Sequence, residues 1–236
     1  TYYAASCAGF VCHTINPRLF PEQIIYIINH AADSYVFLDP DFFGLIESIA
    51  DQCRNVKGWV VMTSSERMPE TTISNVLCYE KLVDENDDKF SWPELDEDSA
   101  CALCYTSGTT GNPKGVLYSH RSTVLHALIQ CFYNSGSFAP KKKILPIVPL
   151  FHANAWGIPY SAPISGTSLV FPGANLDGKS VYDLLEKYSV NSAWGVPTVW
   201  MGLLEEIAQR GGKKPDGLEE MLVGGSAAAK SLIEAF

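Results

Sequence analysis

Residues 105–115 read Tyr-Thr-Ser-Gly-Thr-Thr-Gly-Asn-Pro-Lys-Gly, between an apolar stretch at residues 100–105 and the apolar Val116-Leu117-Tyr118. Three glycines let backbone N–H groups turn toward an anion. Four Ser and Thr hydroxyl groups add hydrogen-bond donors, and one lysine brings a positive charge. These residue types predict a loop that binds a polyphosphate, because a turn without a ligand needs neither the hydroxyl groups nor the lysine.

The spacing in this loop differs from that of the Walker A motif, in which the lysine follows a glycine directly and opens a helix. Here Lys114 follows Pro113, and Gly115 and a β-like run come next. The dinucleotide fingerprint G-x-G-x-x-G is also absent. A P-loop kinase or GTPase is therefore a poor fit.

Residues 105–115 closely resemble the phosphate-binding motif of the adenylate-forming superfamily, which includes acyl-CoA synthetases, luciferases and the adenylation domains of peptide synthetases. Residues 149–160, Pro-Leu-Phe-His-Ala-Asn-Ala-Trp-Gly-Ile-Pro-Tyr, look like the acyl-binding segment of the fatty acyl-CoA synthetase branch. Residues 222–230, Leu-Val-Gly-Gly-Ser-Ala-Ala-Ala-Lys, resemble the adenine-binding loop, although family members commonly have proline where Ala229 stands.

The resemblance implies a role for individual residues in each segment. Thr106 would bind Mg²⁺, and Thr106 and Lys114 would act in catalysis by electrostatic stabilisation. His152, also assigned to catalysis, would lie by the substrate carboxylate, and Trp156 would gate the acyl channel. Val196 and Gly225 would line the substrate site, and Val196 is equally well explained by core packing. The ATP phosphates would be held by Thr106, Ser107, Gly108, Thr109, Thr110, Gly111 and Lys114, and the adenine by Gly224, Gly225, Ser226 and Ala227.

The reaction implied by the resemblance is a two-step ligation. A carboxylate attacks the α-phosphate of ATP to give an acyl-adenylate and pyrophosphate, and the thiol of coenzyme A then displaces AMP. The expected substrate is a medium- or long-chain fatty acid. One alternative is a short sulfur-containing or aromatic acid, and another is a nucleotide-binding remnant without turnover.

His152 and Trp156 are four residues apart, so they fall on the same side of their segment if it is helical, and both would face one cavity. By composition alone, His152 and Trp156 would be core residues. The phosphate loop earlier in the chain favours the other interpretation, in which both belong to the binding site. Cys101 and Cys104 have the spacing of a zinc or redox motif. They lie in an apolar strand, where residues three apart point to opposite faces, so we interpret them as structural thiols.

Hydrophobic periodicity predicts the class of fold. Strands and helices alternate, and the strands are apolar on both faces, which predicts an α/β fold with largely parallel sheets covered by helices on both faces. By resemblance, this would be part of the large N-terminal domain of an acyl-CoA synthetase. Helices are expected at 21–31, 43–53, 121–133, 181–188 and 197–207, and strands at 35–38, 59–62, 100–105, 144–148, 167–171, 191–195 and 220–223.

Composition excludes several other classes of protein. The chain has 236 residues, 47% of them hydrophobic and 18% charged, which is typical of a globular protein. A net charge of −9 argues against a nucleic-acid-binding surface. No apolar run reaches the ~20 residues of a transmembrane segment. Seven scattered cysteines indicate reduced thiols and an intracellular, cytoplasmic protein.

The resemblance also predicts what lies beyond Phe236: a Tyr-Gly-x-Thr-Glu motif, a ribose-binding Asp and a C-terminal lid domain with its catalytic lysine. Residues 1–236 are therefore expected to be an incomplete N-terminal adenylation domain, inactive alone, with an acidic surface connection at 84–98. A truncated sheet would expose apolar edges, so aggregation or pairing as a homodimer is expected.

Overall fold

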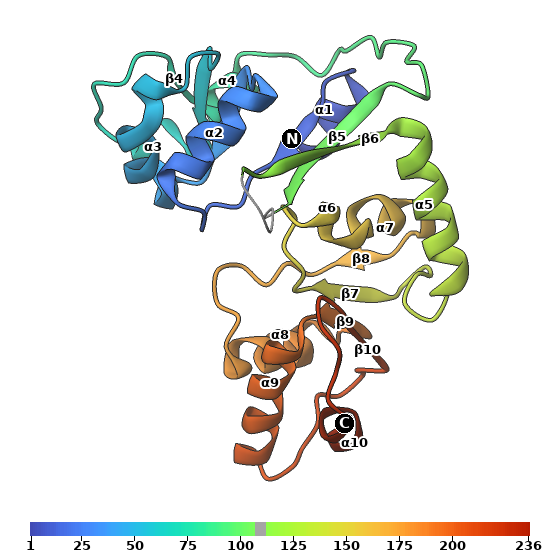
Figure 1. Cartoon of the computed structure of the whole chain (residues 1–236). Helices are drawn as coiled ribbons and strands as arrows, with labels where there is room; N and C mark the ends of the chain where they lie inside the picture. The colour runs from blue at the N-terminus through green and yellow to red at the C-terminus, as the bar shows by residue number, and fades with distance from the viewer. Residues whose placement is uncertain (107–111) are drawn as a thin grey trace. The chain divides into compact units, whose positions relative to one another are not determined.

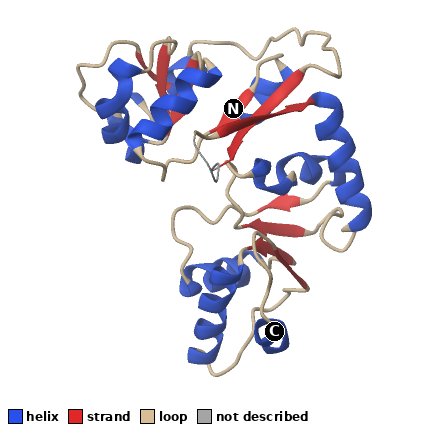
Figure 2. Ribbon diagram, viewed as in Figure 1, coloured by secondary structure: helices blue, strands red, loops and turns tan. Residues whose placement is uncertain are grey.

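The computed structural model describes residues 1–106 and 112–236, and the chain divides into two compact units, residues 1–118 and residues 119–236. Each unit is built from β-strands with helices packed against them (Figures 1 and 2). The strand pairs whose register is described are all parallel. The α/β class predicted from the alternating pattern is therefore confirmed.

The first unit contains two three-stranded sheets, with strand orders β2-β3-β4 and β1-β5-β6. In the first sheet, Val36 pairs with Trp59 and Trp59 with Val76. The elements of this unit are α1 (Tyr2–Cys7), β1 (Cys12–Thr14), α2 (Pro21–Ala31), β2 (Tyr35–Leu38), α3 (Phe43–Ile49), β3 (Gly58–Val61), β4 (Val76–Cys78), α4 (Tyr79–Asp84), β5 (Ala100–Thr106) and β6 (Lys114–Ser119), with short 3₁₀ turns at Pro40–Phe42, Ala50–Gln52 and Ser65–Arg67.

Helix α2 follows the predicted pattern and covers the β2-β3-β4 sheet. Pro21 occupies the first helical position, where a missing N–H costs nothing, and the helix buries Ile24, Ile27 and Ile28. Together with α3, it forms a core around Trp59 and Val61 of β3, the central strand. Burial of an isoleucine contributes about 1.5–3 kcal/mol, so this apolar face accounts for the packing of α2.

Strand β2 differs from its prediction. The run Tyr35–Leu38 is apolar throughout and predicts a buried strand, yet Tyr35 is 55% exposed and Phe37 42% exposed, whereas Leu38 is buried. The cause is the strand's position at the edge of its sheet. Alternate side chains of a strand point to opposite faces, and only the face that carries Leu38 contacts the core.

The second unit has one four-stranded parallel sheet in the order β10-β9-β7-β8. Both faces of this sheet are covered by helices, as predicted. The elements are α5 (His120–Tyr133), β7 (Lys143–Pro146), α6 (Ala153–Trp156), α7 (Ile158–Ser165), β8 (Ser168–Leu169), α8 (Gly178–Tyr188), β9 (Ser192–Gly195), α9 (Pro197–Gln209), β10 (Glu220–Val223) and α10 (Lys230–Ala235).

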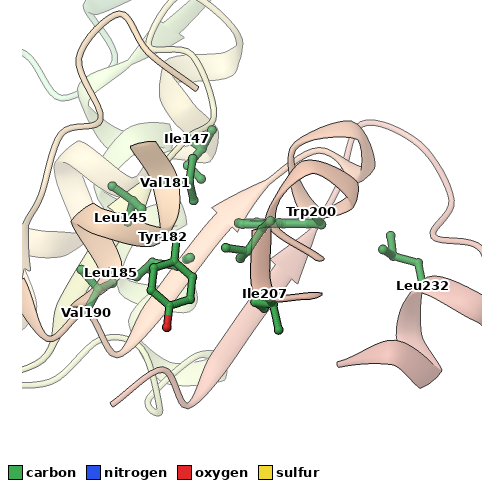
Figure 3. Close-up of a cluster of buried hydrophobic side chains, with 11 residues drawn as sticks. Leu145, Ile147, Val181, Tyr182, Leu185, Val190, Trp200, Ile207 and Leu232 are labelled. Carbon is green, nitrogen blue, oxygen red and sulfur yellow. The ribbon is translucent and has the colours of Figure 1, made fainter. Parts of the chain in front are cut away.

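Neighbouring residues of the central strands enter the two different cores. Leu145 and Ala193 pack with α8, α9 and α10, around Trp200 (Figure 3). Ile144 and Trp194 pack on the other side, with residues of α6 and α7. This alternation is the two-residue period of a strand buried on both faces, and it explains why β7 and β9 each carry consecutive buried apolar residues.

The order of the strands places a topological switch point at β7. From β7 the chain crosses to β8 on one side, and it then returns to β9 and β10 on the other side. In open α/β sheets, ligands bind outside the carboxyl ends of the strands at such a point. The segments that leave these carboxyl ends are residues 147–152, 196 and 224–229.

Three further predictions concern the chain as a whole. Within residues 1–106 and 112–236, no helix combines the length and apolarity that a bilayer crossing requires. Residues 84–98 are exposed along their whole length. In the described part of the chain no cysteine takes part in a disulfide bond, and no three His, Cys, Asp or Glu side chains are grouped to hold a metal ion.

Candidate functional site

The predicted phosphate loop connects two neighbouring strands of the first unit, β5 and β6. Thr106 is the last residue of β5, Lys114 is the first of β6, and both are exposed. The Thr106 hydroxyl donates a hydrogen bond of 3.5 Å to the Lys114 carbonyl oxygen, so the two residues face each other at the base of the loop. The predicted residues Ser107, Gly108, Thr109, Thr110 and Gly111 lie outside the described residues.

Lys114 opens a strand, as the sequence predicts. In a Walker A motif the lysine would open a helix. Gly115 in this strand is favoured by packing rather than by conformation. A Cβ atom there would lie 3.1 Å from Leu103 Cδ1 and 3.2 Å from Tyr105 Cζ. The glycine therefore leaves room beside β6 for the side chain of Tyr105, the residue before Thr106.

A group of polar side chains that sequence reasoning left unassigned surrounds Tyr105. Its hydroxyl group lies 2.7 Å from His30 Nδ1, and its ring lies 5.1 Å from the ring of His13. His13 Nδ1 in turn lies 2.8 Å from an Asp33 carboxylate oxygen. Burial, and secondarily the negative charge of Asp33, raise the pKa of the Tyr105 hydroxyl, which therefore stays protonated and able to donate. These contacts fix the strand end from which the loop starts.

The candidate acyl segment, in the second unit, is not a right-handed helix. Four successive residues, Ala153, Asn154, Ala155 and Trp156, have φ between 46° and 56°, and Gly157 has φ of 83°. The segment is thus a left-handed turn, and His152 before it is extended (φ −106°, ψ 106°). The helical geometry that would place His152 and Trp156 on one side is therefore not present. His152 is exposed, and Trp156 is half-buried.

This turn is costly for the residues that form it. The left-handed conformation brings Cβ too close to the following carbonyl oxygen, at roughly 1–2 kcal/mol for each residue other than glycine, and asparagine adopts it more readily than most. Ala153, Ala155 and Trp156 therefore carry strain of roughly 3–6 kcal/mol, which surrounding contacts must offset. Strain of this kind collects at functional sites, and here it falls on the segment that carries Trp156.

Trp156 lies directly against the candidate adenine loop. A Cβ atom on Gly224 would fall 2.3 Å from Trp156 Cη2 and 2.7 Å from Cζ2, so only glycine fits beneath the indole. On its other side the indole is 6.4 Å from the ring of Trp194, on β9. The next residue, Gly225, has φ of 79°, and a Cβ atom there would lie 3.2 Å from Val196 Cγ1.

Four of the predicted site residues therefore meet at the carboxyl edge of the second sheet. Trp156 follows β7, Val196 follows β9, and Gly224 and Gly225 follow β10. Ser226 and Ala227 continue the last of these loops and are exposed. The arrangement is an apolar ring and a small apolar side chain beside exposed backbone, which suits a flat or extended apolar group.

A cavity of about 340 Å³ lies elsewhere, after β2 and β3 in the first unit. Asp39, Asp41, Thr63 and Arg67 are among its lining residues, and none of the predicted site residues lines it. Two carboxylates and one guanidinium give it a mixed charge rather than the clustered donors that a polyphosphate needs.

The chain belongs to the AMP-binding enzyme family, which it matches over residues 1–236. It is 50% identical over 236 residues to the medium-chain-fatty-acid–CoA ligase of Ectopseudomonas oleovorans, and 48% identical over 235 residues to the 3-methylmercaptopropionyl-CoA ligase of Ruegeria lacuscaerulensis. Both matches cover 100% of this chain and 43% of the relative, so the chain spans less than half the length of these proteins.

The fold is similar to that of the anthranilate CoA ligase AuaEII, whose crystal structure contains anthranoyl-AMP. The TM-score is 0.79, with 20% identity over 99% of this chain and 44% of that one. This likeness concerns the fold alone. Family membership and fold thus agree with the resemblance drawn from the motifs at residues 105–115, 149–160 and 222–230.

Proposed function

We propose that the protein is an ATP-dependent acyl-CoA ligase that activates a medium- or long-chain fatty acid through an acyl-adenylate. The observation that carries the proposal is the meeting of Trp156, from the acyl segment, with Gly224, from the adenine loop. An enzyme that joins a carboxylate to AMP needs its acid and its nucleotide side by side. Relatives that are CoA ligases, at 50% and 48% identity, support the same reaction class.

In the first step, the acid needs no general base. A carboxylic acid has a pKa near 4, so at neutral pH it is already the carboxylate that attacks the α-phosphate of ATP. The attack adds negative charge to phosphate oxygens, and pyrophosphate leaves. We assign to Lys114 the stabilisation of this charge, together with Ser107, Gly108, Thr109, Thr110 and Gly111.

Magnesium fits the chemistry of the loop. Thr106 offers an exposed hydroxyl oxygen at the end of β5, and Mg²⁺ takes oxygen ligands, mostly from water and substrate phosphates, with few from protein. When bound, the ion would neutralise charge on the phosphates. Thr106 would hold it, and Lys114, opposite Thr106, would face the same phosphates.

On the acid side, we assign to Trp156 the mouth of the acyl channel, and to Val196 and Gly225 its wall. His152 is exposed at the start of the turn, where it can approach a carboxylate. Gly224, Gly225, Ser226 and Ala227 would receive the adenine, because a glycine-rich backbone lets a flat purine lie against it. Coenzyme A would then take the acyl group from AMP.

A second candidate substrate is a short sulfur-containing acid. The observation that favours it is the 48% identity to a 3-methylmercaptopropionyl-CoA ligase, nearly equal to that of the fatty acid enzyme. We further propose that the protein works in the cytoplasm, since its cysteines form no disulfide in the described structure, and that it pairs as a homodimer.

The test is acid-dependent exchange of labelled pyrophosphate into ATP by the protein expressed from its full natural gene. The acids are butyrate, octanoate, palmitate, benzoate and 3-methylmercaptopropionate, followed by a CoA thioester assay on those that respond. The proposal requires the highest kcat/KM for octanoate or palmitate. A preference for 3-methylmercaptopropionate would select the second candidate. ATP binding without exchange for any acid would leave a nucleotide-binding remnant. Light scattering after size exclusion tests the dimer.

A further inference from the structure

A buried amide from a distant helix is among the groups that hold the left-handed turn at residues 153–157. Gln130, on α5, donates a hydrogen bond of 2.7 Å from Nε2 to the carbonyl oxygen of Trp156. Its Oε1 accepts a hydrogen bond from the Ser161 hydroxyl, on α7. The side chain is only 9% exposed, and both ends of its amide are therefore used.

The rest of this helix face fits the same turn. Ala127, three residues before Gln130, is fully buried. His126, four residues before it, lies so close to Gly157 that a Cβ atom there would be 2.6 Å from the imidazole Cε1 and Nδ1. Residues three and four apart lie on one side of a helix, so His126, Ala127 and Gln130 form one surface of α5, from which His126 and Gln130 reach the turn. Within that surface Gln130 supplies the hydrogen bond to Trp156.

Placing glutamine in this position is unfavourable unless both of its polar groups are satisfied, because an unpaired buried amide loses its hydrogen bonds to water. The hydrogen bond to the Trp156 carbonyl also fixes the peptide plane next to the Trp156 Cα. That plane and the left-handed φ of the turn together set the direction of the Trp156 Cα–Cβ bond, from which the indole extends to contact range of Gly224. A change at Gln130 is thereby transmitted to the ring.

We propose that Gln130 is a positioning residue that sets the indole of Trp156 and, through it, the acyl-length preference of the enzyme. The second half of this statement rests on the proposed function. Acyl length is discriminated by apolar volume, and a small displacement of a ring at the mouth of a channel changes the volume available. Gln130 itself touches neither substrate nor nucleotide in this assignment.

The experiment compares Gln130→Met and Gln130→Glu with Tyr182→Phe in the protein expressed from its full natural gene. Methionine has a similar size and removes both hydrogen bonds. Glutamate keeps the acceptor for Ser161 and removes the donor to Trp156. Tyr182 is the matched control, because it is buried in the core on the other face of the same sheet, where its hydroxyl donates a hydrogen bond of 3.2 Å to the Lys213 carbonyl oxygen.

Three readouts separate positioning from mere stability. They are the ratio of kcat/KM for octanoate to that for palmitate, the KM for ATP, and acrylamide quenching of the Trp156 fluorescence, obtained by subtracting the Trp156→Phe spectrum of each variant. Both Gln130 variants should change the ratio by at least about fivefold, which is within the range that pocket contacts give. Both variants should raise the acrylamide quenching of Trp156. They should change the KM for ATP by a smaller factor than they change the octanoate-to-palmitate ratio. Tyr182→Phe should lower the unfolding temperature only.

The decisive comparison is made in a Trp156→Ala background. If Gln130 acts through the indole, adding Gln130→Met to Trp156→Ala should not change the octanoate-to-palmitate ratio any further, because the effects of coupled residues do not add. The proposal is overturned if Gln130→Met changes the ratio as much in the Trp156→Ala background as in the wild type. It is also overturned if both Gln130 variants leave the ratio and the Trp156 quenching unchanged. If Gln130→Met does not fold, Gln130→Glu carries the test. If the wild type shows no acid-dependent exchange, the proposed function fails, and the quenching measurement still decides whether Gln130 positions Trp156.

Discussion

Replacement of Gly224 by alanine tests the contact on which the proposed site depends. The new Cβ would lie 2.3 Å from Trp156 Cη2, whereas carbon atoms pack at 3.5 Å or more, so the indole must move by about 1.2 Å. A displacement of about 1 Å in a positioned group can cost about a hundredfold in rate. We therefore expect kcat/KM for the fatty acid to fall about a hundredfold, or about 2.7 kcal/mol.

The assay is pyrophosphate exchange with octanoate and palmitate, supported by thermal unfolding. Gly202→Ala is the control, because its Cβ would meet nothing nearer than Gly178 N at 3.5 Å. Trp156→Phe removes the ring atoms that collide with the new Cβ. In a Trp156→Phe background, Gly224→Ala should therefore lower kcat/KM much less than it does in the wild type. The reasoning is refuted if Gly224→Ala keeps the wild-type kcat/KM, or if it lowers kcat/KM equally in both backgrounds.

Lys114→Ala should slow adenylation far more than it weakens fatty acid binding, because the positive charge acts on phosphate; equal losses in exchange rate and in acid affinity would contradict this role. Gly178→Ala should destabilise the protein by about 3 kcal/mol in thermal or urea unfolding, since its Cβ would lie 2.0 Å from the backbone oxygen of Gly202, whereas Gly202→Ala should be neutral or stabilising. Burial raises the pKa of the Cys12 thiol to about 11, so at pH 9 only about 1% is thiolate. Iodoacetamide followed by mass spectrometry should therefore label Cys12 more slowly than the exposed Cys7, with a rate that climbs up to about pH 11. Equal labelling at pH 9 would count against that burial.

The elements that depend on local pattern were predictable. Helix α2 begins at Pro21 and buries Ile24, Ile27 and Ile28, the positions that the 3.6-residue period selects. The strand after Lys114 and the parallel pairing of β7, β9 and β10 also follow from alternation of apolar runs and helices. In each of these segments, local preference and tertiary burial agree, and a single sequence is then sufficient.

The left-handed turn could not be predicted in this way. Ala153, Ala155 and Trp156 have no preference for positive φ, and only Asn154 and Gly157 are residue types that adopt it readily. Burial of Ala155 and a hydrogen bond to Trp156 from a residue 26 positions away help to offset the strain, and no short-range pattern reports either. The contacts around Tyr105 are similar, since His30 is 75 residues from it in the chain. Exposure of β2 was missed because burial depends on which strand occupies the edge of a sheet.

The strand order explains why separated motifs meet in the second unit. A sheet wound in a single direction would send successive crossovers over the same side and bury the loops between them. Here the chain leaves β7 toward β8 and returns to β9, and it then continues to β10, so the segments after β7 and β9 run in opposite directions from the carboxyl edge of the sheet. β10 then adds Gly224 to that edge, where its missing side chain admits the ring of Trp156. The motifs at residues 149–160 and 222–230 mark the candidate acyl and adenine segments, and the reversal of strand order at β7 brings the two into contact.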